Sequence, residues 1–281
     1  LMRLTGGNTK VRAGEFAFRE HMSAFDALNV IYQSDPITHP LTIPEGYSVR
    51  QIADLLAEKQ LGSREKFLEL TLSAAAAQKY NLRAPTLEGF LYPDTYHFSR
   101  VDTEQKMIDA MVQHFFDVAT PLMKEFAGKT QMTLEQVTTL ASIIEKETGA
   151  PSERPLISSV FHNRLRKKMR LQSDPTCIYG IPNYNGNITK KDLQTWSPYN
   201  TYKINGLPPG PIASPGLLSL RAALEPAHSD FLYFVAGTNG ASLFTKDYRS
   251  HARHVENEQI APEKKKNRRR PASKRSARSR R

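Results

Sequence analysis

The chain has 281 residues, of which 39% are hydrophobic, and a formal net charge of +11. This is enough for a globular protein with a substantial core, in one large domain or in a domain with a smaller module. Residues 261–281 hold eleven Lys/Arg and one Glu and carry +10 of the net charge, so the charge does not indicate that the rest of the chain binds nucleic acid. The single cysteine excludes a disulfide framework.

Two segments near the start of the chain have the same predicted order of elements. Residues 10–15 lead into a helix that ends near Gln33, and residues 43–47 lead into a helix at 49–59. Each segment has the pattern of a short strand, a glycine turn and an amphipathic helix. The polar break at residues 34–40 separates them and predicts a domain boundary.

The rest of the chain alternates helical patterns with a late hairpin. Helices are predicted at residues 64–72, 104–126, 134–148 and 153–168. A strand at residues 231–236 can pair with residues 242–245 across an Asn-Gly turn, which is a strong hairpin signal. The fold class is therefore α+β, with mixed helices and small sheets, and no run of about 18 apolar residues predicts a membrane span.

The helix predicted at residues 134–148 is well delimited. Thr133 and Gln136 have the spacing of a capping box at its start, and Gly149 marks its end. Its apolar residues recur at helical spacing and form one stripe: Val137, Leu140, Ile143 and Ile144. This stripe predicts which face of the helix is buried.

Two carboxylates near the end of this helix are expected to face different surroundings. Glu147 falls about 20° from Leu140 on a helical wheel, on the predicted buried side, and Glu145 falls about 140° away. Burial and a position in the last helical turn both raise the pKa of Glu147, so it could protonate a glycosidic oxygen near neutral pH. The helix pattern by itself leaves open a structural role, in which Glu147 bonds a turn or an arginine.

Several motifs in order along the chain resemble one family. They are residues 87–95 (Leu-Glu-Gly-Phe-Leu-Tyr-Pro-Asp-Thr), 140–148 (Leu-Ala-Ser-Ile-Ile-Glu-Lys-Glu-Thr), 152–154, 160–165 (Val-Phe-His-Asn-Arg-Leu), 169–176 (Met-Arg-Leu-Gln-Ser-Asp-Pro-Thr), 199–202, 206–212 and 233–236. From about Lys10 to Val255 the chain thus resembles the endolytic murein transglycosylase (YceG-like) family. The resemblance implies that the catalytic acid is the second Glu of Glu-Lys-Glu, which is Glu147.

The resemblance also implies an organisation and a location. Residues 1–40 would be the remnant of a LysM-like module, and residues 41–260 the transglycosylase catalytic domain. A single N-terminal membrane helix, absent from this sequence, would place the catalytic domain on the periplasmic side of the bacterial inner membrane, with peptidoglycan synthases as partners. Residues 261–281 lie outside the family pattern and are predicted to be a disordered basic tail, either dispensable or attracted to an anionic surface. No specific nucleic acid is expected, since no such motif occurs in the body.

The implied reaction cleaves the bond between N-acetylmuramic acid (MurNAc) and N-acetylglucosamine (GlcNAc) in nascent peptidoglycan strands. It leaves a 1,6-anhydro-MurNAc end and would terminate glycan polymerisation. No cofactor or metal is expected, because the histidines lack metal-ligand spacing and the close pair His251 and His254 lies near the end of the chain. Two alternatives remain: a hydrolase in which Asp174 or Asp94 activates water, and a non-catalytic glycan-binding scaffold.

Sugar recognition requires planar hydrogen-bonding groups and aromatic faces, and the family-like motifs supply both. The candidate substrate-binding residues are Glu88, Tyr92, Asp94, Asn163, Arg164, Gln172, Asp174, Tyr199, Asn200 and Tyr202.

Overall fold

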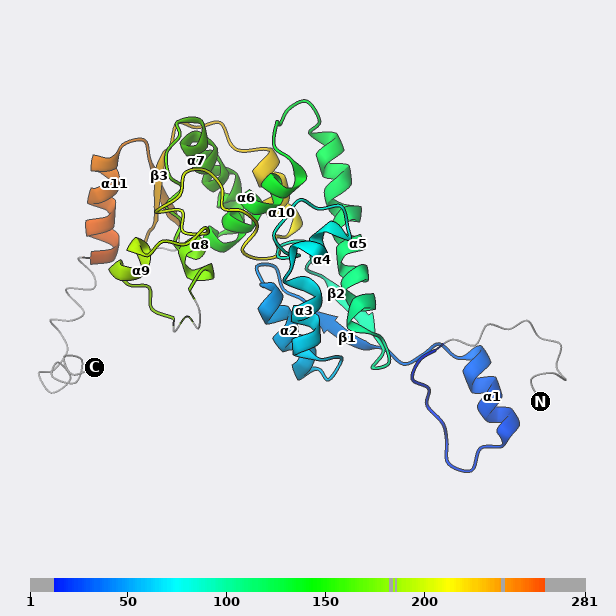
Figure 1. Cartoon of the computed structure of the whole chain (residues 1–281). Helices are drawn as coiled ribbons and strands as arrows, with labels where there is room; N and C mark the ends of the chain where they lie inside the picture. Colours follow the sequence, from blue (N-terminus) through cyan, green and yellow to red (C-terminus); the bar gives the residue numbers. More distant parts are fainter. Residues whose placement is uncertain (1–12, 182–183, 185, 239–240, 261–281) are drawn as a thin grey trace, which may run out of the picture. The chain divides into compact units, whose positions relative to one another are not determined.

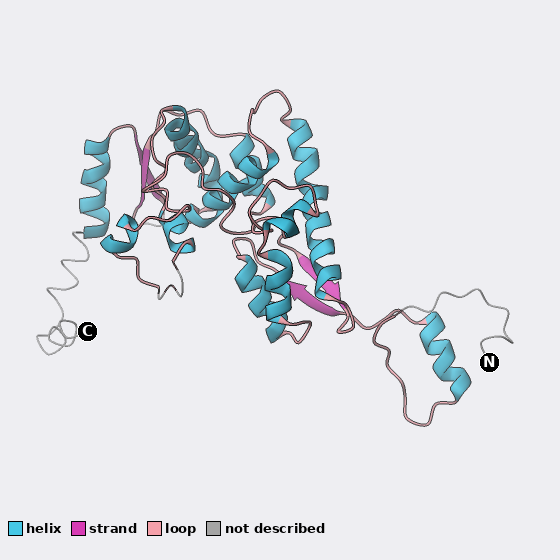
Figure 2. Ribbon diagram, in the orientation of Figure 1, coloured by secondary structure: helices cyan, strands magenta, loops and turns pink. Residues whose placement is uncertain are grey.

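The computed structural model describes residues 13–181, 184, 186–238 and 241–260. The described chain is a mostly helical α+β protein with two separate two-stranded antiparallel sheets (Figure 1, Figure 2). It divides into two compact units. Unit 1 comprises Leu1–Thr138 and Gly210–Gly216, and unit 2 comprises Thr139–Pro209 and Leu217–Arg281.

Unit 1 combines one short sheet with helices. Its elements are α1 (Ala24–Gln33), β1 (His39–Thr42), α2 (Val49–Glu58), α3 (Arg64–Thr71), α4 (Ala74–Gln78), β2 (Thr95–Phe98), α5 (Glu104–Glu125) and the start of α6 (Leu134–Glu147). Strands β1 and β2 pair with His39 opposite Phe98 and Thr42 opposite Thr95. Most of these helices begin where a Ser or Thr side chain accepts a hydrogen bond from a backbone N–H of the first turn, as Ser48 does for α2.

The core of unit 1 forms where helices α2, α3 and α5 bury their apolar faces. Phe90 packs edge to face on Phe115 of α5, with ring centroids 5.2 Å apart. The side chain of Glu88 is also buried here, and its Oε1 accepts the N–H of Val49 at 2.9 Å, so it satisfies a donor in the first turn of α2.

Unit 2 packs helices against a hairpin. Its elements are the C-terminal part of α6, η1 (Pro151–Glu153), α7 (Arg154–Arg166), α8 (Asp174–Tyr179), α9 (Lys190–Gln194), α10 (Leu217–Leu224), β3 (Tyr233–Ala236), β4 (Ser242–Thr245), α11 (Tyr248–Val255) and the π-helical turn η2 (Glu256–Ile260). Phe161 of α7 packs edge to face on Phe234 of β3 at 5.9 Å. Helix α11 lies beside β3 (Figure 1). The side chain of His251 stacks on Tyr233, with ring centroids 5.2 Å apart.

The long elements agree with the sequence analysis. The predicted helices at 49–59, 64–72, 104–126, 134–148 and 153–168 correspond to α2, α3, α5, α6 and α7, with ends that differ by at most two residues. The hairpin forms as predicted, with Ala236 opposite Ser242, although turn residues 239–240 lie outside the described part of the chain. The capping box of α6 is confirmed, because Gln136 and Thr133 bond each other's backbone N–H groups.

The short strand predicted at the start of residues 43–47 is wrong, because the strand lies just before them, at His39–Thr42. The glycine turn predicted in the same segment is present, and Gly46 has a φ of 78° there. Gly46 N–H donates to the carbonyl of Ser214 at 2.8 Å, and Ser214 N–H donates to the carbonyl of Tyr47 at 2.8 Å. A distant segment of unit 1 therefore supplies the hydrogen-bond partners of this turn, which no local pattern shows.

The N-terminal expectations are met only in part. Of the predicted strand at residues 10–15, residues 10–12 lie outside the described chain, and Glu15 forms an isolated bridge with Ile37. The predicted boundary at residues 34–40 falls inside unit 1. The described part of residues 1–40 holds α1, this bridge and the start of β1, and does not show a LysM-like module.

Residues 261–281, which are predicted to be a disordered tail, lie outside the described residues. None of the described helices has both the length and the hydropathy required to cross a bilayer.

A glycine pair tests how tightly unit 1 is packed. Gly89 has a φ of 82°, and a Cβ there would lie 2.3 Å from Cβ of Pro211; Gly128 has a φ of 80° with no atom within 4 Å. We expect Gly128→Ala to lose about 1–2 kcal/mol from backbone strain, and Gly89→Ala to lose about 1–3 kcal/mol more from overpacking. Urea unfolding measures both, and equal losses would show that Pro211 does not confine Gly89.

Candidate active site

A cavity of about 630 Å³ lies within unit 2. Its size falls in the range of about 300–1,000 Å³ that is usual for small-molecule sites. Its lining combines polar, aromatic and aliphatic side chains from α6, α7, the segment before α8 and the start of α8, the loop after α9, the hairpin and α11. The lining residues are Glu147, Phe161, Arg164, Leu171, Gln172, Asp174, Tyr202, Tyr233, Phe234, Val235, Ala236, Ser242, Tyr248, His251 and Val255. Residues more than 100 positions apart in the chain therefore meet at one site.

Glu147 is the last residue of α6 and presents its carboxyl to this cavity. The pKa of Glu147 is raised to about 7, and burial is the largest cause. The Ser173 hydroxyl and the Arg164 cation act to lower this pKa, and the charge of Asp174 acts to raise it. Ser173 Oγ donates to Glu147 Oε1 at 2.6 Å. Such a carboxyl is partly protonated at neutral pH, so it can both donate and accept a proton.

The position of Ser173 is fixed by a buried cluster of hydroxyl groups. Ser173 N–H donates to Thr201 Oγ1 at 2.9 Å, and Thr176 Oγ1 donates to the Ser173 carbonyl at 2.7 Å. The two threonine hydroxyls are 2.8 Å apart, and all three residues are almost completely buried. Because Gln172 before them adopts a φ of 49°, the chain turns sharply and directs the Ser173 hydroxyl toward Glu147.

Asp174 and Tyr202 form a second polar pair at the cavity. Tyr202 Oη donates to Asp174 Oδ1 at 2.6 Å. Burial and then this hydrogen bond raise the pKa of Tyr202, so its hydroxyl stays a neutral donor at physiological pH. Asp174 itself is exposed, in contrast to the half-buried Glu147.

Arg164 of α7 brings a positive charge to the cavity. Its Nε donates to the carbonyl of Leu232 at 2.7 Å, and its Nη1 donates to the carbonyl of Leu171 at 2.6 Å. Its guanidinium carbon also lies 5.1 Å from the ring centroid of Tyr233. Arg164 thus ties α7 to the hairpin and to the segment before α8 while its charge acts on Glu147.

The second carboxylate of the helix end has a different partner. Arg154 Nη2 donates to Glu145 Oε1 at 2.8 Å, and the two side chains are 9% and 7% exposed. The prediction that only Glu147 is on a buried side is therefore wrong, because α6 is enclosed on more than its apolar stripe. The two carboxyls differ instead in their partners, a cation for Glu145 and a neutral hydroxyl for Glu147.

Five of the predicted site residues line this one cavity: Glu147, Arg164, Gln172, Asp174 and Tyr202. Asn163 and Asn200, also in unit 2, donate through their amides to backbone carbonyls, at 2.9 Å to Ser229 and at 2.7 Å to Thr195 respectively. Tyr199 packs on Tyr179.

The remaining three predicted residues lie in unit 1. Glu88 bonds the start of α2, Tyr92 packs on His114, and Asp94 Oδ2 lies 3.6 Å from Nδ1 of the same histidine. Their part in substrate binding stays a prediction.

Four residues at the site are not among the predicted catalytic or substrate-binding residues. Ser173, which bonds Glu147, lies inside a family-like motif and could have been chosen for that reason. Tyr233 and Tyr248 line the cavity from β3 and α11, and His251 lies between them. His251 was set aside because it is near the chain end, and no spacing rule connects it to Glu147.

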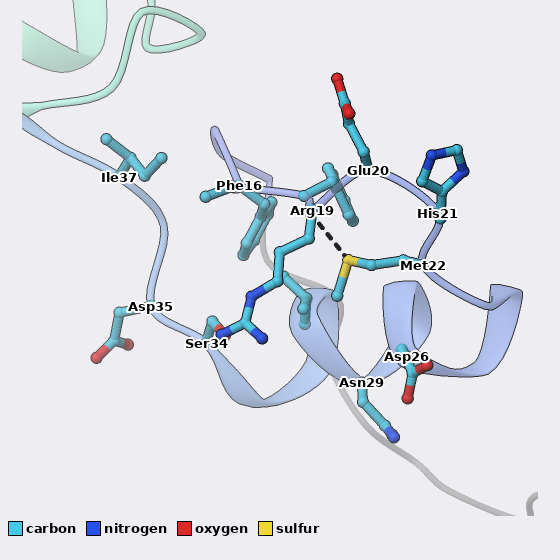
Figure 3. Close-up of a pocket in the computed structure, with 13 residues that line it drawn as sticks. Phe16, Arg19, Glu20, His21, Met22, Asp26, Asn29, Ser34, Asp35 and Ile37 are labelled. Atoms are coloured by element: carbon cyan, nitrogen blue, oxygen red, sulfur yellow. Dashed lines mark hydrogen bonds between the residues drawn. The ribbon is translucent and has the colours of Figure 1, made fainter.

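A second cavity, of about 790 Å³, lies around α1 in unit 1 (Figure 3). Its carboxylates Glu20, Asp26 and Asp35 are dispersed around the rim and point away from one another, and backbone N–H of Arg19 donates to Met22 Sδ at 3.1 Å. It therefore brings no acidic groups together, and we place the chemistry in unit 2. Among the described residues, no group of three or more His, Cys, Asp or Glu is arranged to bind a metal ion.

The arrangement in unit 2, one acid with a raised pKa in a partly polar and aromatic cavity, is chemically suited to acid–base catalysis. The chain belongs to the YceG-like family, whose model matches residues 1–257. It is 36% identical to a YceG-like protein of Listeria monocytogenes of known crystal structure, with a TM-score of 0.69 over 83% of this chain and 81% of that one.

Curated relatives carry the name endolytic murein transglycosylase. The relative from Bacillus subtilis (strain 168) is 37% identical over 227 residues, which cover 75% of this chain and 62% of the relative. The relative from Streptococcus pneumoniae serotype 2 (strain D39) is 31% identical over 279 residues, which cover 88% of this chain and 50% of the relative. The chain thus spans between half and two thirds of the length of these proteins.

Removing the Ser173 hydroxyl should raise the pKa of Glu147. The hydroxyl stabilises the ionised carboxylate, so Ser173→Ala should move the titration of Glu147 upward from about 7 by about one pH unit. Carbon-detected NMR of the Glu147 carboxyl measures this shift without requiring activity. Ser159→Ala, which removes a hydroxyl bonded to Leu156 and Ser229, is the control and should leave the titration unchanged.

Glu145 should matter for stability and not for chemistry. Glu145→Gln leaves Arg154 without its buried carboxylate and should cost about 3 kcal/mol of unfolding free energy. Asp230→Asn, which removes the partner of Lys246 in an exposed pair, should leave the unfolding curve unchanged. Thermal or urea unfolding measures the stability of both variants. A Glu145→Gln protein as stable as the parent would contradict a stabilising role for the Arg154–Glu145 pair.

Proposed function

We propose that this protein is an endolytic peptidoglycan lytic transglycosylase. It would cleave the MurNAc–GlcNAc bond within nascent glycan strands and leave a 1,6-anhydro-MurNAc end, which terminates polymerisation. The observation that carries the proposal is the Glu147 carboxyl, half-buried in a cavity of unit 2 with a pKa of about 7. Membership of the YceG-like family and the name of its curated relatives support it.

One carboxyl is enough for this reaction. Protonated Glu147 donates its proton to the glycosidic oxygen, and the bond from MurNAc C1 to that oxygen breaks, so GlcNAc leaves with a free hydroxyl. The Glu147 carboxylate then accepts the proton of the MurNAc C6 hydroxyl as this oxygen bonds to C1. Glu147 ends protonated as it began, and no water is consumed. A pKa near neutrality suits both steps, because the protonated and the ionised forms of Glu147 are both accessible at neutral pH.

The neighbours of Glu147 have distinct parts in this scheme. The Arg164 cation favours the carboxylate that forms after proton transfer, and the Ser173 hydroxyl orients it. Gln172, Asp174 and Tyr202 line the same cavity and are proposed to contact the sugar. We keep Asn163, Tyr199, Asn200, Glu88, Tyr92 and Asp94 as further proposed substrate-binding residues on the strength of their motifs.

The proposed site of action follows from the substrate. Peptidoglycan lies outside the cytoplasm, so the catalytic domain would face the periplasmic side of a bacterial inner membrane, held there by a single N-terminal helix. Peptidoglycan synthases would be its partners, since they produce the strand that it cleaves. A LysM-like module near the N-terminus would bind the same glycan.

Replacing the acid tests the proposal directly. Glu147→Gln keeps the shape but cannot donate a proton, so cleavage of uncrosslinked glycan strands should fall by a factor of about 100 or more. Glu225→Gln makes the same change at an exposed carboxylate, 62% exposed, and should leave the rate unchanged. A Glu147→Gln protein that cleaves as fast as the parent would contradict the catalytic role and favour a glycan-binding scaffold.

Product masses then separate the two types of cleavage. The parent should release strands with anhydro ends, each lighter by one water than a hydrolysed end. If every new end were reducing, a hydrolase that uses Asp174 or Asp94 to activate water would replace the transglycosylase in this proposal.

A further inference from the structure

One part of the cavity lining is aromatic. Tyr233 of β3 stacks on the imidazole of His251 at 5.2 Å with an interplanar angle of 23°, and the Tyr248 ring lies 6.3 Å from the same imidazole. All three side chains line the cavity that holds Glu147. Tyr248 is 68% exposed, so this aromatic wall, defined here as Tyr233, Tyr248 and His251, extends from the cavity to the surface.

The imidazole of His251 lacks a partner within the described chain. Neither ring nitrogen makes a hydrogen bond there, and Nδ1 is shielded from solvent. A shielded polar atom without a partner costs about 1–3 kcal/mol, and stacking on Tyr233 does not satisfy it. Burial first, and then the Arg164 and His254 charges, lower the pKa of His251, so the ring is neutral at physiological pH and can accept as well as donate.

We propose that the aromatic wall is a sugar-binding subsite of the Glu147 cavity, in which a sugar ring lies against Tyr248 and Tyr233 and hydrogen-bonds the His251 imidazole. The occupant is an N-acetylated hexosamine of the glycan strand, whose hydroxyl and acetamido groups supply the missing hydrogen bond. Apolar faces with a few fixed polar groups are the usual composition of a small-ligand pocket. This inference rests on the proposed function, because it assigns a part of the same substrate to the same cavity.

Binding to a protein that cannot cleave separates this inference from the reaction type. In the Glu147→Gln background, the dissociation constant for uncrosslinked glycan strands is measured for His251→Phe, which keeps a ring on Tyr233 but removes both nitrogens. We expect binding about tenfold weaker, the effect of one hydrogen bond. His254→Phe makes the same change on the same helix outside the cavity lining and should bind within a factor of two of the background.

A second pair of variants at the same position tests the subsite even if the His251→Phe protein misfolds. Asn and Leu have similar shapes, so His251→Asn should bind more tightly than His251→Leu if a polar atom is what the sugar requires. Tyr248→Ala should also weaken binding, because it removes the exposed part of the wall. Equal binding by the His251→Phe and His254→Phe proteins, or by the Asn and Leu proteins, would overturn the subsite.

The outcomes for the two proposals are distinguishable. Products with reducing ends only would end the transglycosylase assignment but leave this binding result unaffected. A Glu147→Gln protein that binds no glycan strand would overturn the subsite itself.

Discussion

The hydrogen bond from Ser173 to Glu147 links the candidate active site to the packing of unit 2. The hydroxyl belongs to a buried cluster with Thr176 and Thr201, which joins the segment before α8 to residues 199–202. A neutral donor stabilises the carboxylate less than a salt bridge would, so burial dominates and the pKa of Glu147 stays near neutrality. The same contact therefore orients the acid without holding it permanently ionised.

The neighbouring Glu145 illustrates the alternative. It is two residues away on the same helix and is also buried, but Arg154 bonds it directly. A carboxylate paired with a buried guanidinium serves the structure, since removing either partner leaves an uncompensated charge. The two acids of one tripeptide thus differ because α7 places Arg154 beside the first, whereas burial outweighs the opposing effects of Ser173 and Arg164 on the pKa of the second.

The cavity depends on segments that are distant in the chain. Glu147 comes from α6, Arg164 from α7, Asp174 from the start of α8, and Tyr233 and His251 from the hairpin and α11. Arg164 connects three of these through hydrogen bonds to Leu232 and Leu171 and its contact with Tyr233. The guanidinium of Arg164 therefore has two roles, since it positions a wall of the cavity and its charge lowers the pKa of Glu147.

By itself the sequence determined the long helices and the late hairpin, and it predicted Glu147 as the candidate acid. Periodicity, caps and the Asn-Gly turn are local signals, and the ordered motifs identified the family. Only the tertiary structure decided the position of β1, the burial of Glu145, the hydrogen bond of Ser173 to Glu147 and the place of His251 in the same cavity. The physical reason is that these features depend on partners far away in the chain, such as Ser214 for the turn at residues 43–47 or Arg154 for Glu145. A helical wheel predicts the direction of a side chain. The partner of that side chain depends on which element packs against that face of the helix.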